Sequence, residues 1–148
     1  MADPMMSRIG AAMELSHRGE REEAREVFMR LWQDADAPLH RCAIAHAMAD
    51  VQDDPHEELA WDLRALDAVA DVTDEDAAAA GMTSTAGAMR PSLHLNLAED
   101  YRKLGERAAA RRHLELGLAA CDALPDDGYG RMIRGGLERL AERLGTIT

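Results

Sequence analysis

The stretch that decides the fold is Pro91–Cys121, with the sequence PSLHLNLAEDYRKLGERAAARRHLELGLAAC. Alanine and leucine, both strong helix formers, dominate its apolar positions. The triplet Leu104-Gly105-Glu106 interrupts the pattern, and a glycine there can adopt the left-handed conformation in which helices end. The stretch therefore predicts two antiparallel helices joined by a turn.

The same spacing of small, large and glycine residues recurs near the start of the chain. In the later stretch the positions are Leu97, Ala98, Tyr101, Gly105, Ala110 and Leu114. In the earlier stretch they are Ala11, Ala12, Leu15, Gly19, Ala24 and Phe28. The offset is 86 residues throughout, which corresponds to two periods of about 34 residues and an insertion of about 18. Residues 71–90, where the helical pattern breaks, are the expected place of that insertion.

This pattern resembles the tetratricopeptide repeat (TPR), in which small residues let two helices cross closely and large residues fill the gaps to the next helix. The resemblance is to a small bacterial TPR-like protein. It implies an all-α fold, a right-handed array of antiparallel helix pairs (an α-solenoid), in a single domain of residues 1–148. The expected parts are about three pairs (5–34, 38–70 and 91–122), the insertion 71–90 and a C-terminal capping helix, 128–144. His94 departs from the family pattern, because it stands where tryptophan is common.

Proline and polar residues mark the expected helix starts. Asp3-Pro4, Asp36-Ala37-Pro38 and Asp54-Pro55 each place an acidic residue shortly before a proline at the first helical position. Thr73 is positioned to cap a short helix over the alanines that follow. Near the C-terminus, Gly135-Gly136 either weakens the last helix or lets it lie close to a neighbour.

The helix expected to begin at Pro55 carries two apolar stripes on different faces, which predicts packing on both sides. One stripe consists of Leu59, Leu63, Leu66 and Ala70. The other consists of Trp61, Ala65, Ala68 and Val72. The repeat register of this middle pair stays open, because either Leu59 or Ala60 can be aligned with Ala24.

Composition narrows the class of protein. Hydrophobic residues make up 47% of the 148 residues, which suffices for a core, and runs of strand-forming residues are absent. The net charge of −11 argues against binding nucleic acid or an anionic membrane. Cys42 and Cys121 have no metal or redox spacing and are expected to be packed thiols. With no membrane-spanning run and no signal-peptide core at the N-terminus, we expect a cytoplasmic protein.

The residue patterns do not predict an enzyme. His56-Glu57-Glu58 lies at an expected helix start, where acidic residues are favoured without any metal. Cys42 and His46 are four residues apart, but no orienting group for a nucleophile is apparent. We therefore predict a non-catalytic protein without a metal or another cofactor.

The TPR resemblance implies a concave groove lined by the first helix of each pair, in which another protein or peptide binds. The positions beside the core stripe of these helices are the candidate groove residues. They are Ile9, Met13, His17, Leu95, Asn96, Glu99 and Arg102. The predicted function is thus a protein–protein interaction module, or adaptor. The alternatives are a homo-oligomer, and a regulatory protein that senses a ligand or peptide with residues 71–90 as a lid.

Negative charge is concentrated in the middle of the chain. Residues 50–76 contain eleven acidic residues and one basic residue, Arg64, for a net charge of −10. One interpretation is a solvated helix pair with some pairing to the basic stretch 90–112. The other is an acidic surface that meets a basic partner.

Overall fold

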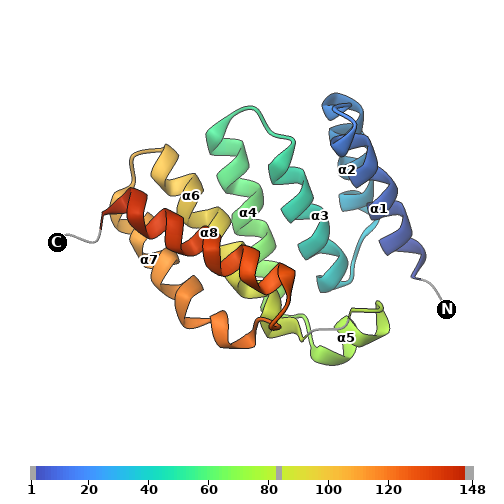
Figure 1. Ribbon diagram of the computed structural model, residues 1–148. Helices are drawn as coiled ribbons and strands as arrows, with labels where there is room; N and C mark the ends of the chain where they lie inside the picture. The colour runs from blue at the N-terminus through green and yellow to red at the C-terminus, as the bar shows by residue number, and fades with distance from the viewer. Residues whose placement is uncertain (1–2, 83–84, 146–148) are drawn as a thin grey trace. The chain divides into compact units, whose positions relative to one another are not determined.

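A computed structural model describes residues 3–82 and 85–145 (Figure 1). Over these residues the chain is helical and contains no strand. It divides into two compact units, Met1–Thr83 and Ser84–Thr148. Unit 1 contains α1 (Pro4–His17), α2 (Arg21–Asp34), α3 (Pro38–Asp50), α4 (Pro55–Val69) and α5 (Asp74–Ala79). Unit 2 contains the 3-10 turns η1 (Ala86–Met89) and η2 (Cys121–Ala123), and the helices α6 (Arg90–Lys103), α7 (Arg107–Ala119) and α8 (Gly128–Leu144).

The local signals for helix ends at Asp3, Asp54, Gly19 and Gly105 are confirmed. The Asp3 carboxylate accepts from the backbone N–H of Met5 and Met6, and Asp54 caps α4 in the same way at His56. Gly19 and Gly105, 86 residues apart, have φ of 83° and 80° in the two equivalent turns. A side chain is strained in this conformation, which explains glycine at both places.

The predicted insertion is partly helical. Thr73 and Asp76 form a reciprocal capping box at the start of α5, each side chain accepting from the other residue's backbone N–H. Ala77, in the middle of this short helix, is fully buried. The boundary between the units falls within the insertion, and its residues Thr83 and Ser84 lie outside the described residues.

In unit 1, α3 packs on both helices of the first pair and also pairs with α4. The buried side chains that join these helices include Ile9 and Ala12 from α1, Phe28 from α2 and Met48 from α3. On α4, Trp61 and Ala65 are buried as predicted, but Leu63 is exposed. The apolar stripe that contains Leu63 is therefore only partly buried.

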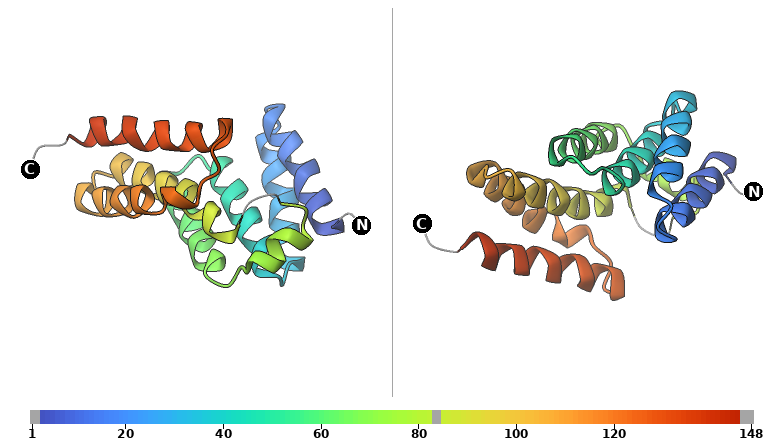
Figure 2. Two further views of the ribbon diagram at one scale, coloured as in Figure 1. Left: turned by 60° about the horizontal axis from the view of Figure 1, so that its bottom comes forward. Right: turned by 90° about the horizontal axis from the view of Figure 1, so that it is seen from above.

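In unit 2, α8 packs on α6 and α7 (Figure 2), in the way that α3 packs on α1 and α2. Its apolar side chains form one cluster with the pair. The cluster contains Ala98, Ala110, Leu114, Leu124, Ile133, Leu137, Leu140 and Leu144. A Cβ atom on Gly136 would lie 2.8 Å from Leu95 Cδ2, and one on Gly117 would lie 2.9 Å from Leu137 Cδ2. Of the two interpretations of Gly135-Gly136, the structure supports close helix packing at Gly136, whereas Gly135 is near only the side chain of Arg139.

Every helix predicted for the three pairs and the C-terminal cap is present in the described residues. The residues shared by the two matching stretches are largely core: Ala12, Ala24 and Phe28 are buried, as are Ala98, Ala110 and Leu114. No helix in the described part of the chain is both long and apolar enough to cross a membrane. The all-α class is therefore confirmed, and the assignment to a TPR-like solenoid stays a prediction.

Candidate partner-binding groove

The structure separates the predicted groove residues into two sets. Those on α1 belong to unit 1, where Ile9 is only 1% exposed and forms part of the core under α3. Met13 is 40% exposed, and His17 near the end of the helix is also exposed. Ile9 is therefore a packing residue. Of the three groove residues predicted on α1, Met13 and His17 are the exposed ones.

Of the residues predicted on α6, Leu95 and Glu99 contact α8 of their own unit. Leu95 packs against the apolar cluster beneath α8. Glu99 accepts from Arg102 Nε at 3.0 Å, and its other partner, Arg143 on α8, lies 3.9 Å away. The hydrogen bond from Arg102 lowers the pKa of Glu99. Asn96 is half-buried on the same helix.

Ile9 is buried and Leu95 is partly buried, each within its own unit. They occupy equivalent positions, 86 residues apart, on the face of a helix pair that receives the next helix of the same unit. Spacing along one helix identifies a face but does not say whether another helix will cover it. Here Ile9 is buried in unit 1, where α3 packs on α1, and Leu95 packs against the cluster to which α8 contributes.

An open groove lies instead among α2, α3 and α4 of unit 1. One end of it, which we call the tryptophan pocket, has a volume of about 560 Å³. Residues from the end of α2, the start of α3 and the second half of α4 line this pocket. They are Trp32, Asp36, Pro38, Arg41, Leu63, Arg64, Asp67, Ala68 and Asp71.

The two tryptophans of the chain meet at this groove. The rings of Trp32 and Trp61 pack edge to face, with their centroids 5.1 Å apart and their planes at 86°. Trp61 is buried, whereas Trp32 is half-buried and lines the tryptophan pocket. This pair gives the groove a rigid aromatic base.

An arginine guanidinium group lies over each of the two tryptophan rings. The guanidinium carbon of Arg41 lies 3.6 Å from the centroid of the Trp32 ring, and that of Arg64 lies 4.3 Å from the Trp61 ring. Arg41 Nη1 also donates to the carbonyl oxygens of Trp32 (3.3 Å) and Ala35 (2.9 Å) at the end of α2. These carbonyls have no partner further along the helix, so the arginine fixes α3 to the end of α2.

A second pocket, of about 410 Å³, continues the groove toward the other end of α3. Arg64 lines both pockets, and Trp61 lies in the wall of the second. Met29 on α2 and Met48 on α3 add flexible apolar surface, and Met29 is 39% exposed. The groove therefore combines tryptophan and methionine surface with charged side chains at its edges.

Arginines of α2 hold the far end of α3 in place. Arg25 donates through Nε (3.1 Å) and Nη2 (2.7 Å) to the carbonyl of Val51, just after α3. Arg21 donates to the carbonyl of Gln52 and, at 3.0 Å, to the carboxylate of Asp53. The hydrogen bond from Arg21 lowers the pKa of Asp53. Because α2 is bound to α3 near both ends, the base of the groove is fixed.

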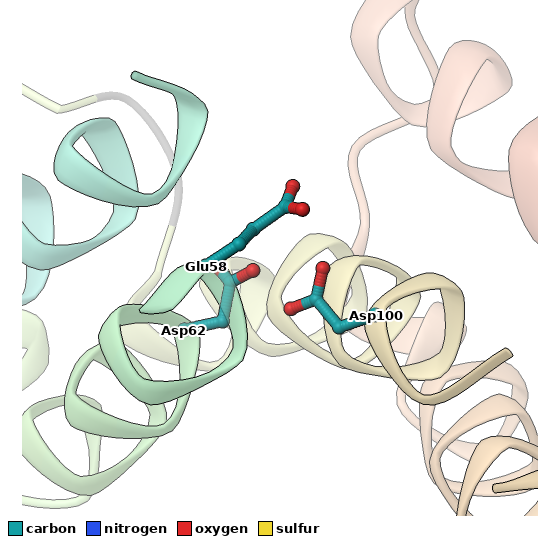
Figure 3. Close-up of side chains that lie close together, drawn as sticks. All are labelled: Glu58, Asp62 and Asp100. Atoms are coloured by element: carbon teal, nitrogen blue, oxygen red, sulfur yellow. The ribbon is translucent and has the colours of Figure 1, made fainter. Parts of the chain in front are cut away.

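Each unit also contains a buried aspartate. Asp62 on α4 is 1% exposed, and Glu58 projects from the same side of that helix one turn earlier (Figure 3). Asp100 on α6, in unit 2, is 2% exposed. The burial of Asp62 and Asp100 is not apparent from the sequence, because both lie among polar, helix-forming residues.

In unit 2 an aromatic stack joins α6 to α7. His94 Nδ1 and His113 Nδ1 are 3.1 Å apart, and Tyr101 stacks on the other side of His113 with a centroid distance of 5.5 Å. Burial lowers the pKa of His94 to about 4, with further lowering by His113 and Arg90. Burial also lowers the pKa of His113. The two neutral rings can then share one hydrogen, since one Nδ1 donates and the other accepts.

Sequence reasoning did not identify the groove, because it assigned its residues to other roles. Trp61 was placed in a core stripe of α4, and Asp36 was interpreted as a helix-start signal. Ala37 is in fact the residue before α3 and makes no side-chain cap. The signals that could have pointed to the groove are the two tryptophans of the chain and the acidic pair Asp67 and Asp71, one turn apart.

Comparison with known proteins adds no relative: no family model, curated protein or solved structure matches the chain.

Proposed function

We propose that the protein is a non-catalytic interaction module of the TPR-like, α-solenoid type, and that unit 1 binds a segment of a partner protein. The observation that supports this most directly is the open groove among α2, α3 and α4, with the Trp32–Trp61 pair at its base. Aromatic and methionine side chains are enriched where proteins bind each other, and aromatic rings bury much area with little ordering cost.

The dimensions of the groove suit a peptide segment. Its two pockets, of about 560 and 410 Å³, are each large enough for one or two side chains, and Arg64 lines both. Their walls are fixed by the arginine contacts of α2 and α3, so binding requires little rearrangement of the backbone. Exposed Leu63 on α4 offers apolar contact at the entrance of the tryptophan pocket.

The test uses a displayed library of random 12-residue peptides, selected on the full chain. A Leu63→Asp variant changes an exposed pocket residue, and Leu118→Asp, on α7 of unit 2, is the matched control because the two leucines are 39% and 44% exposed. We expect selected peptides to bind the control as they bind the unchanged chain, and to bind Leu63→Asp at least about tenfold more weakly. Melting temperatures within a few degrees would show that both variants remain folded. Failure to select any binding peptide, or equal binding to both variants, would contradict the proposal.

A further inference from the structure

The tryptophan pocket carries an excess of carboxylates over the arginines that line it. Asp36, Asp67 and Asp71 line its edge and are all exposed. None of the three forms an ion pair with any residue in the described part of the chain. The pocket therefore offers several carboxylates beside an aromatic wall, with room for a further group.

The two arginines of the pocket do not neutralise these carboxylates. Arg41 lies on the ring of Trp32 and donates to the carbonyls at the end of α2, and Arg64 lies on the ring of Trp61. Counting both arginines, the lining residues carry a net charge of −1. The surrounding segment, residues 50–76, carries −10. The electrostatic potential at the pocket thus favours a cation.

We propose, resting on the function proposed above, that the segment bound in the groove is basic and that it places a lysine or arginine side chain in the tryptophan pocket. The aliphatic stem of that side chain packs on Leu63, Ala68 and the ring of Trp32. Its charged end lies among Asp36, Asp67 and Asp71. Lysine and arginine have this combination of an apolar stem and a charged end.

The same chemistry explains which partners are disfavoured. An acidic peptide brings its charges against the carboxylates of the pocket and against the negative segment 50–76, which costs free energy for each close like-charged pair. A purely apolar peptide leaves the carboxylates without a counter-charge. Opposite charge also raises the rate of association, and salt weakens this effect.

The experiment reverses the charge of the pocket. Peptides are selected from the random 12-residue library on the full chain and, separately, on the Asp67→Lys/Asp71→Lys variant. The control is Glu14→Lys/Glu115→Lys, which makes the same change in net charge at two exposed carboxylates of α1 and α7 that do not line the pocket. We expect peptides enriched in lysine and arginine on the unchanged chain and on the control. On the pocket variant we expect these peptides to bind at least about tenfold more weakly, and the selected peptides to lose their excess of basic residues.

The outcomes separate this inference from the function on which it rests. Peptides that depend on Leu63 but carry no excess of basic residues would overturn the basic partner and leave the groove in place. Basic peptides that bind the pocket variant and the control equally would show that net charge alone attracts them, which would overturn the assignment to the pocket. If the basic peptides bind as tightly at 500 mM NaCl as at 50 mM NaCl, the proposed charge-based binding is also contradicted.

Discussion

At the scale of single residues, the stack of His94, His113 and Tyr101 makes unit 2 sensitive to acid. The His94 side chain is 6% exposed, so adding a proton places a charge in a poorly solvated position beside a second imidazole. The 3.1 Å contact between the two Nδ1 atoms needs one donor and one acceptor, and it is lost when both nitrogens carry hydrogen.

A glutamine in place of His94 is predicted to reduce the acid sensitivity of the fold. The pKa of His94 falls from 6.5 to about 4 on folding, so the unfolded chain binds the proton more readily between these values. Stability from this group is complete above pH 6.5 and is lost as the pH falls toward 4, by about 3 kcal/mol. Urea unfolding of the unchanged chain and of His94→Gln, at pH 7, 5.5 and 4.5, measures the difference. His17→Gln, at an exposed site on α1, is the control, and an equal pH dependence in all three proteins would refute the prediction.

At the scale of elements, two glycines in helices have opposite roles. Gly117 on α7 lies where a Cβ would come within 2.9 Å of Leu137 on α8 and 3.2 Å of His94 on α6. Gly135 on α8 is close only to the flexible end of Arg139, at 3.1 Å. The first glycine therefore permits three helices to pack closely, whereas the second mainly lowers the helix propensity of α8.

Alanine at these two positions is predicted to change stability in opposite directions. Gly135→Ala should raise the free energy of unfolding by up to about 1 kcal/mol, because alanine favours helix and its methyl displaces only a mobile side chain. Gly117→Ala should lower it by about 1–3 kcal/mol, since the methyl overfills the contact with α6 and α8. Thermal and urea unfolding followed by circular dichroism measure both changes. A stabilising Gly117→Ala would show that the helices move apart at little cost.

At the scale of the whole molecule, each unit consists of at least one antiparallel pair with a further helix packed against it. In unit 1 that helix is α3, and in unit 2 it is α8. Charge is distributed unevenly over the chain, because residues 50–76 hold most of the net charge of −11. Within this segment Asp53 has two arginine partners, Arg21 and Arg25.

Salt is predicted to raise the melting temperature. Exposed ion pairs such as Arg21–Asp53 contribute little to stability, whereas repulsion acts among many carboxylates of the segment 50–76. Screening should therefore relieve more repulsion than it removes attraction when NaCl is raised from 20 to 500 mM. Calorimetry at both concentrations, near pH 7, measures the shift. A fall in melting temperature would mean that the ion pairs outweigh the repulsion.

The sequence by itself determined the helices of this protein, because their ends depend on local chemistry. Asp3, Asp54 and Thr73 cap helices through their own side chains, and Gly19 and Gly105 end them through conformations that neighbours hardly influence. The spacing shared by the two stretches also identified most of the core residues of both pairs, since burial follows the helical period.

Only the tertiary structure decided which faces are covered and which remain open. Ile9 and Leu95 follow the pattern of a surface beside the core, yet Ile9 is buried in unit 1 and Leu95 packs against the cluster that α8 completes. Trp32 and Asp67 were not recognised as groove residues from their places in the sequence, yet they meet at one pocket, because α2, α3 and α4 bring distant positions together there. The period of a helix fixes the direction of each side chain, but the contact it makes depends on helices elsewhere in the chain.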